Sequence, residues 1–127
     1  MKKTALIFSL FALLLSAALA GAGEVSRAQF TSAIDAREPV DDLTEAAAAS
    51  TNKVYFFTEL RDLEGQTVTH RWTYNGNTMA EVSFTPGSAR WRVWSSKELL
   101  PDWTGTWTVA VVDAGGTVLT EKSFEYK

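Results

Sequence analysis

Hydrophobic and polar side chains alternate with a period of two along most of the chain beyond residue 27. This period is typical of β-strands that bury one face, and the 3.6-residue period of a helix is nearly absent. The alternation predicts seven strands, at residues 28–34, 54–60, 67–74, 79–84, 90–95, 105–113 and 118–126. The strand at 54–60 is apolar on both faces, at Tyr55, Phe56 and Phe57, so we expect it in the middle of a sheet.

Turn signals separate these strands. Asn75-Gly76 predicts a two-residue hairpin, because both residue types tolerate the positive φ values of a type I′ turn. Pro86-Gly87 and Ala114-Gly115-Gly116 mark two further turns. Pro39 is predicted to end the first strand, since it lacks a backbone donor.

Two connections carry weak helical signals. Residues 41–52 are polar and alanine-rich without an apolar face, and we expect a long connection there with at most one helical turn. Residues 96–101 are predicted to form one helical turn, with Ser96 as the N-cap and Pro101 as the stop.

Seven short antiparallel strands at regular spacing favour a two-sheet sandwich. The predicted fold is therefore an all-β, seven-stranded antiparallel immunoglobulin-like β-sandwich, which spans residues 21–127 as a single domain. The last hairpin, residues 107–126, resembles the closing pair of many bacterial immunoglobulin-like domains. An eight-stranded barrel is the alternative.

The N-terminus reads as an export signal, residues 1–20. Lys2 and Lys3 precede an apolar run at residues 5–15, and Ala18-Leu19-Ala20 supplies the small residues that signal peptidase recognises. Cleavage is expected after Ala20, with Ala22 as the second choice. The mature protein is then periplasmic or secreted, and membrane contact is expected only if the signal stays uncleaved as an anchor.

Composition and charge exclude several functions. The sequence contains no cysteine and one histidine, which excludes disulfides and argues against an ordinary zinc site. Removal of Lys2 and Lys3 with the signal changes the formal net charge from −3 to −5. A mildly acidic domain is a poor partner for nucleic acid, so we expect none.

Several segments also resemble a known bacterial family. They are REPVDDL (residues 37–43), KVYFFTEL (53–60), THRWTYNG (69–76), MAEVSF (79–84), WRVWSSKELLPDWTGTWTVAVVD (91–113) and SFEY (123–126). Together they resemble the domain of unknown function 2914 family, from Arg27 to Tyr126. The resemblance implies an exported or membrane-attached small β-domain, and it implies no activity and no catalytic residues.

The residues give no support to an enzymatic reading. His70 is the one candidate base, and its phase with Val68 and Trp72 predicts a core position, hydrogen-bonded to a neighbour. The G-x-S-x-G motif that would present a serine is absent. The acids at Asp41-Asp42 and at residues 62–64 are read as solvated loop acids rather than calcium ligands. We therefore expect no enzymatic activity, no cofactor and no metal.

The five tryptophans point instead to core packing and binding. Trp72, Trp91 and Trp107 share the phase of core valines, so we expect them to be buried. Trp94 lies on the opposite face of its strand, and Trp103 lies in a loop. If these two indoles are open to solvent, the candidate binding residues are Arg71, Arg92, Trp94 and Trp103.

Two simpler arrangements compete with binding at these positions. Trp103 would close one end of the sandwich, and Trp94 would shield a sheet face under the stem of Arg92. Arg92 and Trp94 are two residues apart on one strand face, close enough for a cation–π contact with no partner. Arg71 joins them only if its strand shares their sheet.

Two functions remain open at this point. The first is a non-enzymatic protein-interaction module of the cell envelope, which docks to an envelope protein by a sheet face or edge. The second is a carbohydrate-binding module, in which exposed tryptophans are platforms for a glycan. Small β-sandwiches carry many functions, so the fold alone does not decide between them.

Overall fold

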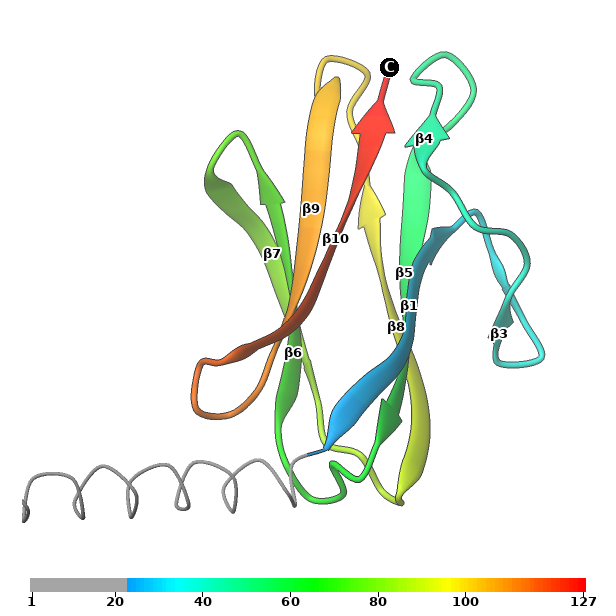
Figure 1. Ribbon diagram of the computed structural model, residues 1–127. Helices are drawn as coiled ribbons and strands as arrows, with labels where there is room; N and C mark the ends of the chain where they lie inside the picture. The colour runs from blue at the N-terminus through cyan, green and yellow to red at the C-terminus, as the bar shows by residue number, and fades with distance from the viewer. Residues whose placement is uncertain (1–22) are drawn as a thin grey trace, which may run out of the picture.

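The computed structural model describes residues 23–127, and ten β-strands occur in that range (Figure 1). The predicted signal peptide lies outside the described residues. The strands are β1 (Glu24–Thr31), β2 (Ile34–Asp35), β3 (Glu38–Pro39), β4 (Glu45–Ala46), β5 (Lys53–Arg61), β6 (Val68–Tyr74), β7 (Asn77–Phe84), β8 (Arg90–Glu98), β9 (Gly105–Val112) and β10 (Val118–Tyr126). In this range no helix has the length and apolar character that crossing a membrane requires.

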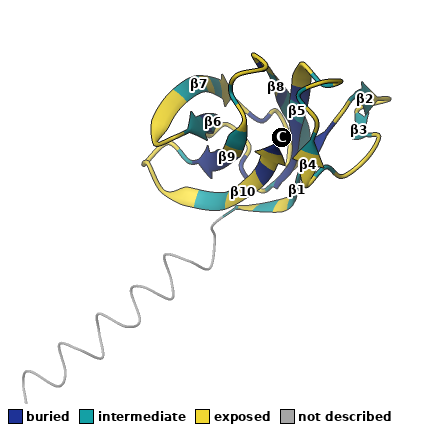
Figure 2. Cartoon of the chain, turned by 90° about the horizontal axis from the view of Figure 1, so that it is seen from above, coloured by how far each residue is buried: buried dark blue, intermediate teal, exposed yellow. Residues whose placement is uncertain are grey.

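The long strands form two sheets that face each other. One sheet has the order β1-β5-β8, and the other has the order β4-β10-β9-β6-β7. Neighbouring strands are antiparallel, except that β4 runs parallel to the end of β10. Figure 1 shows the two layers, and in Figure 2 the dark, buried residues lie between them. The predicted sandwich is confirmed, and β5 is the middle strand of its sheet.

The core fills the space between the two sheets. On β5 the inward positions Val54, Phe56 and Leu60 are buried, and Phe57 and Glu59 on its outer face are buried as well. Trp72 and Trp107 come from the facing sheet and are fully buried, as their phase predicts. Trp91 shares that phase but is only half-buried, so its predicted core position is confirmed in part.

The Asn75-Gly76 turn forms as predicted. Asn75 has a φ of 50° and Gly76 a φ of 76°, and these two residues connect β6 to β7 directly. Two consecutive positive φ values match the right-handed twist of the flanking strands, which is why this dipeptide favours the hairpin.

Three local predictions are wrong or incomplete. The predicted helical turn at residues 96–101 does not form, because β8 continues to Glu98 and pairs with β5 as far as Lys53. The connection at 41–52 contains the short strand β4 and, after it, the single expected turn, in which the backbone N–H groups of Ser50 and Thr51 donate to the carbonyl of Ala47 at 3.1 and 2.8 Å. The first predicted strand is divided, since β1 ends at Thr31 and Ile34 begins the separate β2–β3 hairpin.

Candidate binding surface

Five of the six arginines in the sequence lie on the outer face of the three-stranded sheet or on the hairpin beside it. Four of these arginines pair with two carboxylates, and the fifth, Arg37, lies over Trp94. We call this surface the arginine face, and it consists of Arg27, Arg37, Glu38, Glu59, Arg61, Arg90 and Arg92.

Glu59 is the centre of one half of the arginine face. Its side chain is only 5% exposed, and its Oε1 accepts hydrogen bonds from Arg27 at 2.7 Å and Arg90 at 3.0 Å. Its Oε2 accepts from Ser26 at 2.9 Å and Arg61 at 3.0 Å. The hydrogen bond from Arg27 contributes most to lowering the pKa of Glu59 to about 2. A buried carboxylate with both oxygens bonded to guanidinium groups is electrostatically satisfied.

Glu59 also compensates for the repulsion between two arginines that are paired across neighbouring strands. Arg61 and Arg90 lie directly opposite each other across β5 and β8, and like charges in that position repel. Both guanidinium groups turn toward Glu59, which offsets the repulsion. Their side chains remain 43% and 49% exposed, so both present donors to solvent.

Glu38 is the centre of the other half. Its Oε1 accepts from Arg27 Nη1 at 2.7 Å, and its Oε2 accepts from Arg27 Nη2 at 3.0 Å. The same Oε2 accepts from Arg92 Nη1 at 2.6 Å. The hydrogen bond from Arg27, followed by that from Arg92, lowers the pKa of Glu38 to about 2. Arg27 therefore makes a bidentate contact with the Glu38 carboxylate, and Arg92 adds a third hydrogen bond to it.

The β2–β3 hairpin delivers Glu38 to this position. Ala36 and Arg37 connect its two short strands with φ values of 50° and 65°, although neither residue is glycine or asparagine. The base of the hairpin is fixed, because Asp41 Oδ1 accepts from the backbone N–H of Ser32 at 2.8 Å and from Thr31 Oγ1 at 2.7 Å. These hydrogen bonds also end β1 and direct the chain into the hairpin.

Trp94 lies next to the arginine face on β8. The guanidinium carbon of Arg37 stands 5.5 Å from the centre of its ring, and Arg37 Nη2 donates to the backbone carbonyl of Arg92 at 3.4 Å. A shallow pocket of about 250 Å³ opens beside the indole. It is lined by Arg37, Phe84, Trp91, Arg92, Val93 and Trp94. The pocket therefore combines three aromatic rings with two guanidinium groups.

The structure brings together two of the four predicted binding residues. Arg92 and Trp94 share the outer face of β8, but the cation over Trp94 is Arg37, and Arg92 binds Glu38 instead. The predicted cation–π pair of Arg92 with Trp94 is therefore replaced by one that involves Arg37. The reason is the hairpin, which brings Arg37 and Glu38 onto the sheet face together.

The other two predicted residues lie elsewhere. Arg71 is on β6, in the five-stranded sheet, where it pairs with Glu81 at 3.0 Å. Trp103 lies in the loop between β8 and β9, with its ring 5.8 Å from that of Trp107 and Lys97 placed over it. Trp103 thus packs on the end of the core, which is the simpler of the two arrangements considered from the sequence.

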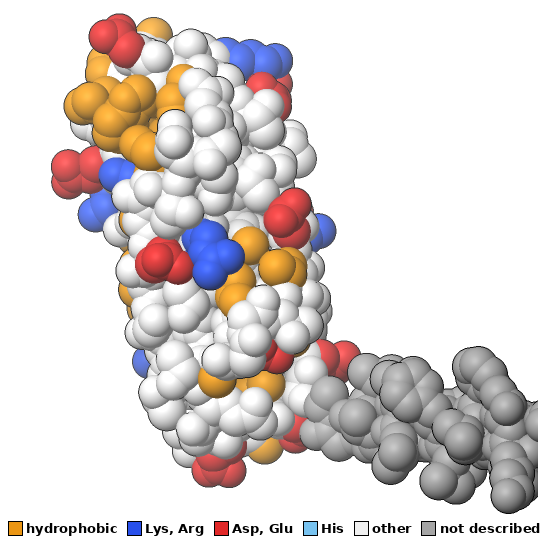
Figure 3. All heavy atoms as spheres, turned by 90° about the vertical axis from the view of Figure 1, so that its left-hand side faces the viewer, with side chains coloured by type: hydrophobic (Ala, Val, Ile, Leu, Met, Phe, Trp, Pro, Cys, Tyr) orange, Lys and Arg blue, Asp and Glu red, His pale blue; other side chains and the backbone are white. Residues whose placement is uncertain are grey.

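The outer face of the five-stranded sheet has no comparable charge cluster. Figure 3 shows that face, where charged side chains stand singly or in small groups of opposite sign among uncharged ones. The ion pair of Arg71 with Glu81 is of this kind, since both side chains are at least 40% exposed. Exposed ion pairs of this kind contribute little to the free energy of folding.

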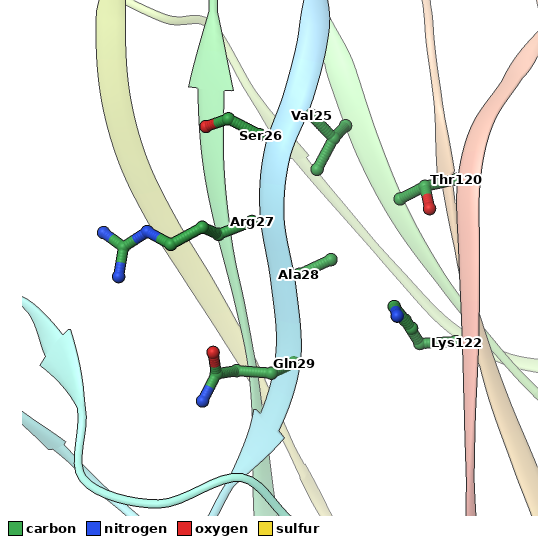
Figure 4. Close-up of a pocket in the computed structure, with 7 residues that line it drawn as sticks. All are labelled: Val25, Ser26, Arg27, Ala28, Gln29, Thr120 and Lys122. Atoms are coloured by element: carbon green, nitrogen blue, oxygen red, sulfur yellow. The ribbon is translucent and has the colours of Figure 1, made fainter.

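A second hollow of about 360 Å³ lies on the side of the sandwich between β1 and β10. Its lining residues are Val25, Ser26, Arg27, Ala28, Gln29, Thr120 and Lys122. Figure 4 shows Val25, Ala28, Thr120 and Lys122 directed into the gap, whereas Arg27 and Gln29 point to the opposite side of β1. This hollow therefore has one charged side chain aimed into it, and its chemistry is less specific than that of the arginine face.

His70 lies in the core, as predicted. Its Nε2 is 2.9 Å from Thr58 Oγ1 and its Nδ1 is 2.8 Å from Ser95 Oγ, so it connects the two sheets. Trp72 Nε1 also donates to Ser95 Oγ, so Ser95 links His70 to Trp72. Thr58 Oγ1 in turn lies 3.5 Å from the carbonyl oxygen of Val93. Burial lowers the pKa of His70 to about 3.

Metal-binding geometry is absent from the part of the chain that the structure describes. No group of three or more histidine, aspartate or glutamate side chains converges there. The carboxylate of Asp41, one of the acids considered from the sequence, instead binds Thr31 and Ser32 at the hairpin base.

Comparison with protein families now tests the predicted resemblance. The family described as a protein of unknown function (DUF2914) matches residues 65–126, which run from the turn before β6 to the end of β10. This match confirms the predicted resemblance over residues 65–126, whereas the earlier part of the predicted span, from Arg27 to residue 64, lies outside it. The DUF2914 segment includes Arg90, Arg92 and Trp94, whereas the hairpin residues Arg37 and Glu38 precede it.

Comparison with solved structures supports the fold. The chain is similar to the crystal structure of an immunoglobulin-like protein from Pseudomonas aeruginosa, with a TM-score of 0.57 and 18% sequence identity. The similarity covers 85% of this chain and 99% of that chain. The predicted immunoglobulin-like fold is confirmed, and at this identity the likeness concerns the fold alone. Comparison with curated proteins gives no match.

Proposed function

We propose that this chain is a non-enzymatic binding module of the cell envelope, which docks to another envelope protein through the arginine face and Trp94. The observation that carries this proposal is the gathering of five of the six arginines on one sheet face, beside a half-buried indole. Arginine and tryptophan are the residue types most enriched at the energetic centres of protein interfaces. The export signal expected at residues 1–20 is what places the module in the envelope.

The geometry favours a protein partner over a glycan. A sugar platform needs exposed indoles spaced along one polar face, and Trp94 and Trp103 do not supply this. Trp94 has Arg37 over its ring, and Trp103 packs against Trp107 at the end of the core. The carbohydrate-binding alternative therefore loses the pair of platforms on which it depends.

The electrostatics support a non-enzymatic role. General acid–base catalysis needs a group whose pKa lies near the working pH. Glu38 and Glu59 are both held as carboxylates, since arginine hydrogen bonds lower the pKa of each to about 2. His70 is held neutral in the core, where no substrate reaches it. No group of the arginine face is thus poised to exchange a proton near neutral pH.

The test is retention of an envelope protein by the immobilised mature chain, with a glycan panel run in parallel. Trp94→Ala is expected to abolish retention with only a small decrease in the melting temperature, because the indole is half-buried on the outer face of β8. Trp103→Ala, which alters a tryptophan away from this face, is the matched comparison and is expected to keep retention. Equal retention by wild type and Trp94→Ala, or glycan binding that needs Trp94, would contradict the proposed function.

A further inference from the structure

The arginine face carries more positive charge than its own carboxylates neutralise. Four guanidinium groups pair with Glu38 and Glu59, and a fifth, that of Arg37, lies beside them over Trp94, while the mature chain as a whole has a formal charge of −5. Among residues 23–127, the nearby carboxylates of Glu24 and Asp35 form no ion pair with these arginines. An otherwise acidic domain therefore has one cationic surface, and a partner that is attracted to it is anionic.

Glu38 shows how this surface holds a carboxylate. Both of its oxygens lie within 3.0 Å of the guanidinium nitrogens of Arg27, and Arg92 adds a contact of 2.6 Å. Side-chain exposure is 40% for Glu38 and 36% for Arg27, so the ion pair is open to solvent. An acidic side chain from another protein can make the same contacts, because they require only a carboxylate in the plane of the guanidinium group.

The hairpin that supplies Glu38 is suited to exchange. Its two strands have two residues each, and Ala36 and Arg37 hold positive φ values that cost free energy in residues with a Cβ. Asp41 fixes the base of the hairpin, so the tip can move without releasing β1. The side-chain contacts that hold the tip on the sheet face are those of Arg37 and Glu38.

We propose that the arginine face binds an acidic segment of the partner protein, one carboxylate of which takes the place of Glu38 between Arg27 and Arg92. This inference rests on the proposed function, because it names the chemistry of the partner that docks there. The pocket beside Trp94 favours a polypeptide over a sulfated glycan or an anionic lipid surface. Phe84, Trp91 and Trp94 line it next to Arg92, so it suits an apolar side chain adjacent to the carboxylates.

The test uses the mature chain and two synthetic peptides, one rich in glutamate with a central leucine, and its counterpart with glutamine in place of each glutamate. Calorimetric titration is expected to detect binding of the glutamate peptide alone. Binding is expected to weaken with added salt, since the screening length falls from about 10 Å at 0.1 M to about 3 Å at 1 M ionic strength. Equal binding of both peptides would overturn the inference.

Variants locate the binding site. Arg61→Gln combined with Arg90→Gln is expected to weaken binding about tenfold or more, because two charge-assisted contacts are removed. Arg71→Gln removes an arginine that is equally paired with a glutamate but lies on the other sheet, and no change is expected. A loss of affinity in Arg71→Gln that matches the double variant would contradict the assignment of the binding site to the arginine face.

Peptide affinity and amide hydrogen exchange test separately whether the partner carboxylate displaces Glu38. Glu38→Gln is expected to tighten peptide binding about threefold or more, because it removes the competing carboxylate. Amide hydrogen exchange is expected to increase in the hairpin of wild-type protein saturated with peptide, while β5 stays protected. Unchanged exchange and unchanged affinity would show that Glu38 is not displaced.

The remaining outcomes separate this inference from the proposed function. Tighter binding of a sulfated polysaccharide or of phosphatidylglycerol vesicles than of the glutamate peptide would overturn the choice of an acidic protein segment. If the glutamate peptide fails to bind while Trp94→Ala still abolishes retention of an envelope protein, the acidic partner is wrong and the docking role stands. If both measurements fail, the docking role is also wrong.

Discussion

At the scale of single residues, His70 shows how a polar group is accommodated in an apolar core. The imidazole lies between hydroxyl groups of the opposite sheet, and Trp72 completes the network through Ser95. Among the described residues, no buried side-chain nitrogen or oxygen lacks a hydrogen-bond partner. A buried polar network with every member paired avoids the cost of an unpaired donor and favours a single packing of the two sheets.

This burial predicts a pH dependence of stability. The pKa of His70 is about 3 in the folded protein, against 6.5 in an unfolded chain, so only the unfolded state takes up this proton between these values. The protein therefore keeps its full free energy of unfolding, as far as His70 affects it, above pH 6.5. This free energy falls as the pH drops from 6.5 toward 3. The slope approaches about 1.4 kcal/mol per pH unit, and urea unfolding between pH 7.5 and about 5 measures it.

NMR titration of His70 in the folded protein tests its lowered pKa without unfolding the chain. The imidazole resonances of wild-type protein are expected to keep the chemical shifts of the neutral form down to about pH 4. Titration of these resonances near pH 6.5 would contradict the burial of His70. Below about pH 4.5, protonation of Glu38 and Glu59 in the unfolded chain adds to the loss, because their pKa values are also lowered in the folded state.

Trp107 gives the largest expected effect of a single substitution. It is fully buried, its ring stacks on Tyr74 at 4.7 Å, and its Nε1 donates to the carbonyl of Trp103 at 2.9 Å. Trp107→Ala is expected to lower the free energy of unfolding by about 3–5 kcal/mol, measured by denaturant unfolding. Trp94→Ala is the control, with a smaller loss because Trp94 is half-buried. A loss below about 1 kcal/mol for Trp107→Ala would be incompatible with its place in the core.

The period-two pattern predicts the face on which a residue lies, because the side chains of a strand alternate strictly. It assigned His70, Trp72 and Trp107 to the inner face, and Arg92 and Trp94 to the outer face. It does not predict which sheet a strand joins, and this is why Arg71 and Arg92, both outward, lie on opposite sides of the molecule. Sheet membership depends on pairings between distant segments, which no local window contains.

At the scale of elements, the β6–β7 hairpin is the clearest case of local sequence setting local structure. Gly76 has a φ of 76°, and a Cβ placed there would meet no atom within 4 Å. Gly76→Ala is therefore expected to cost only the backbone penalty of a left-handed residue, about 1–2 kcal/mol, in denaturant unfolding.

Gly115→Ala is the matched control for this substitution. Gly115 also lies in a turn, but its φ is not in the left-handed region, and the nearest atom to an added Cβ is Asp113 Oδ1 at an ordinary 3.5 Å. Its expected change in the free energy of unfolding is close to zero. Equal losses in both variants would contradict the assignment of the cost at Gly76 to its positive φ.

The elements that complete the arginine face were the least predictable. The strands of the β2–β3 hairpin have two residues each, too short for any alternation to show. Its turn uses Ala36 and Arg37, which carry no turn signal. Ser96 and Pro101 carry local helix signals, yet the pairing of β8 with β5 to Glu98 prevails, because each ladder bond adds to an existing sheet. Arg37 and Glu38 could therefore not be placed beside Arg92 from sequence.

At the scale of the whole molecule, charge is distributed unevenly between the two sheets. The arginines gather on the outer face of the three-stranded sheet, and that of the five-stranded sheet carries scattered charges of both signs (Figure 3). Such an arrangement orients an anionic partner before contact and suppresses approach by the wrong face. Under the proposed function, the outer face of the three-stranded sheet, which carries these arginines, is the face that docks.

Photo-crosslinking in the living cell tests most directly whether the arginine face is the surface that docks to an envelope protein. Ser96 is exposed on the outer face of β8, two residues beyond Trp94, and Ser83 is exposed on β7 in the other sheet. A photoreactive residue at Ser96 is expected to give a discrete adduct with an envelope protein, whereas the same residue at Ser83 gives none. Adducts formed from Ser83 but not from Ser96 would contradict docking through the arginine face.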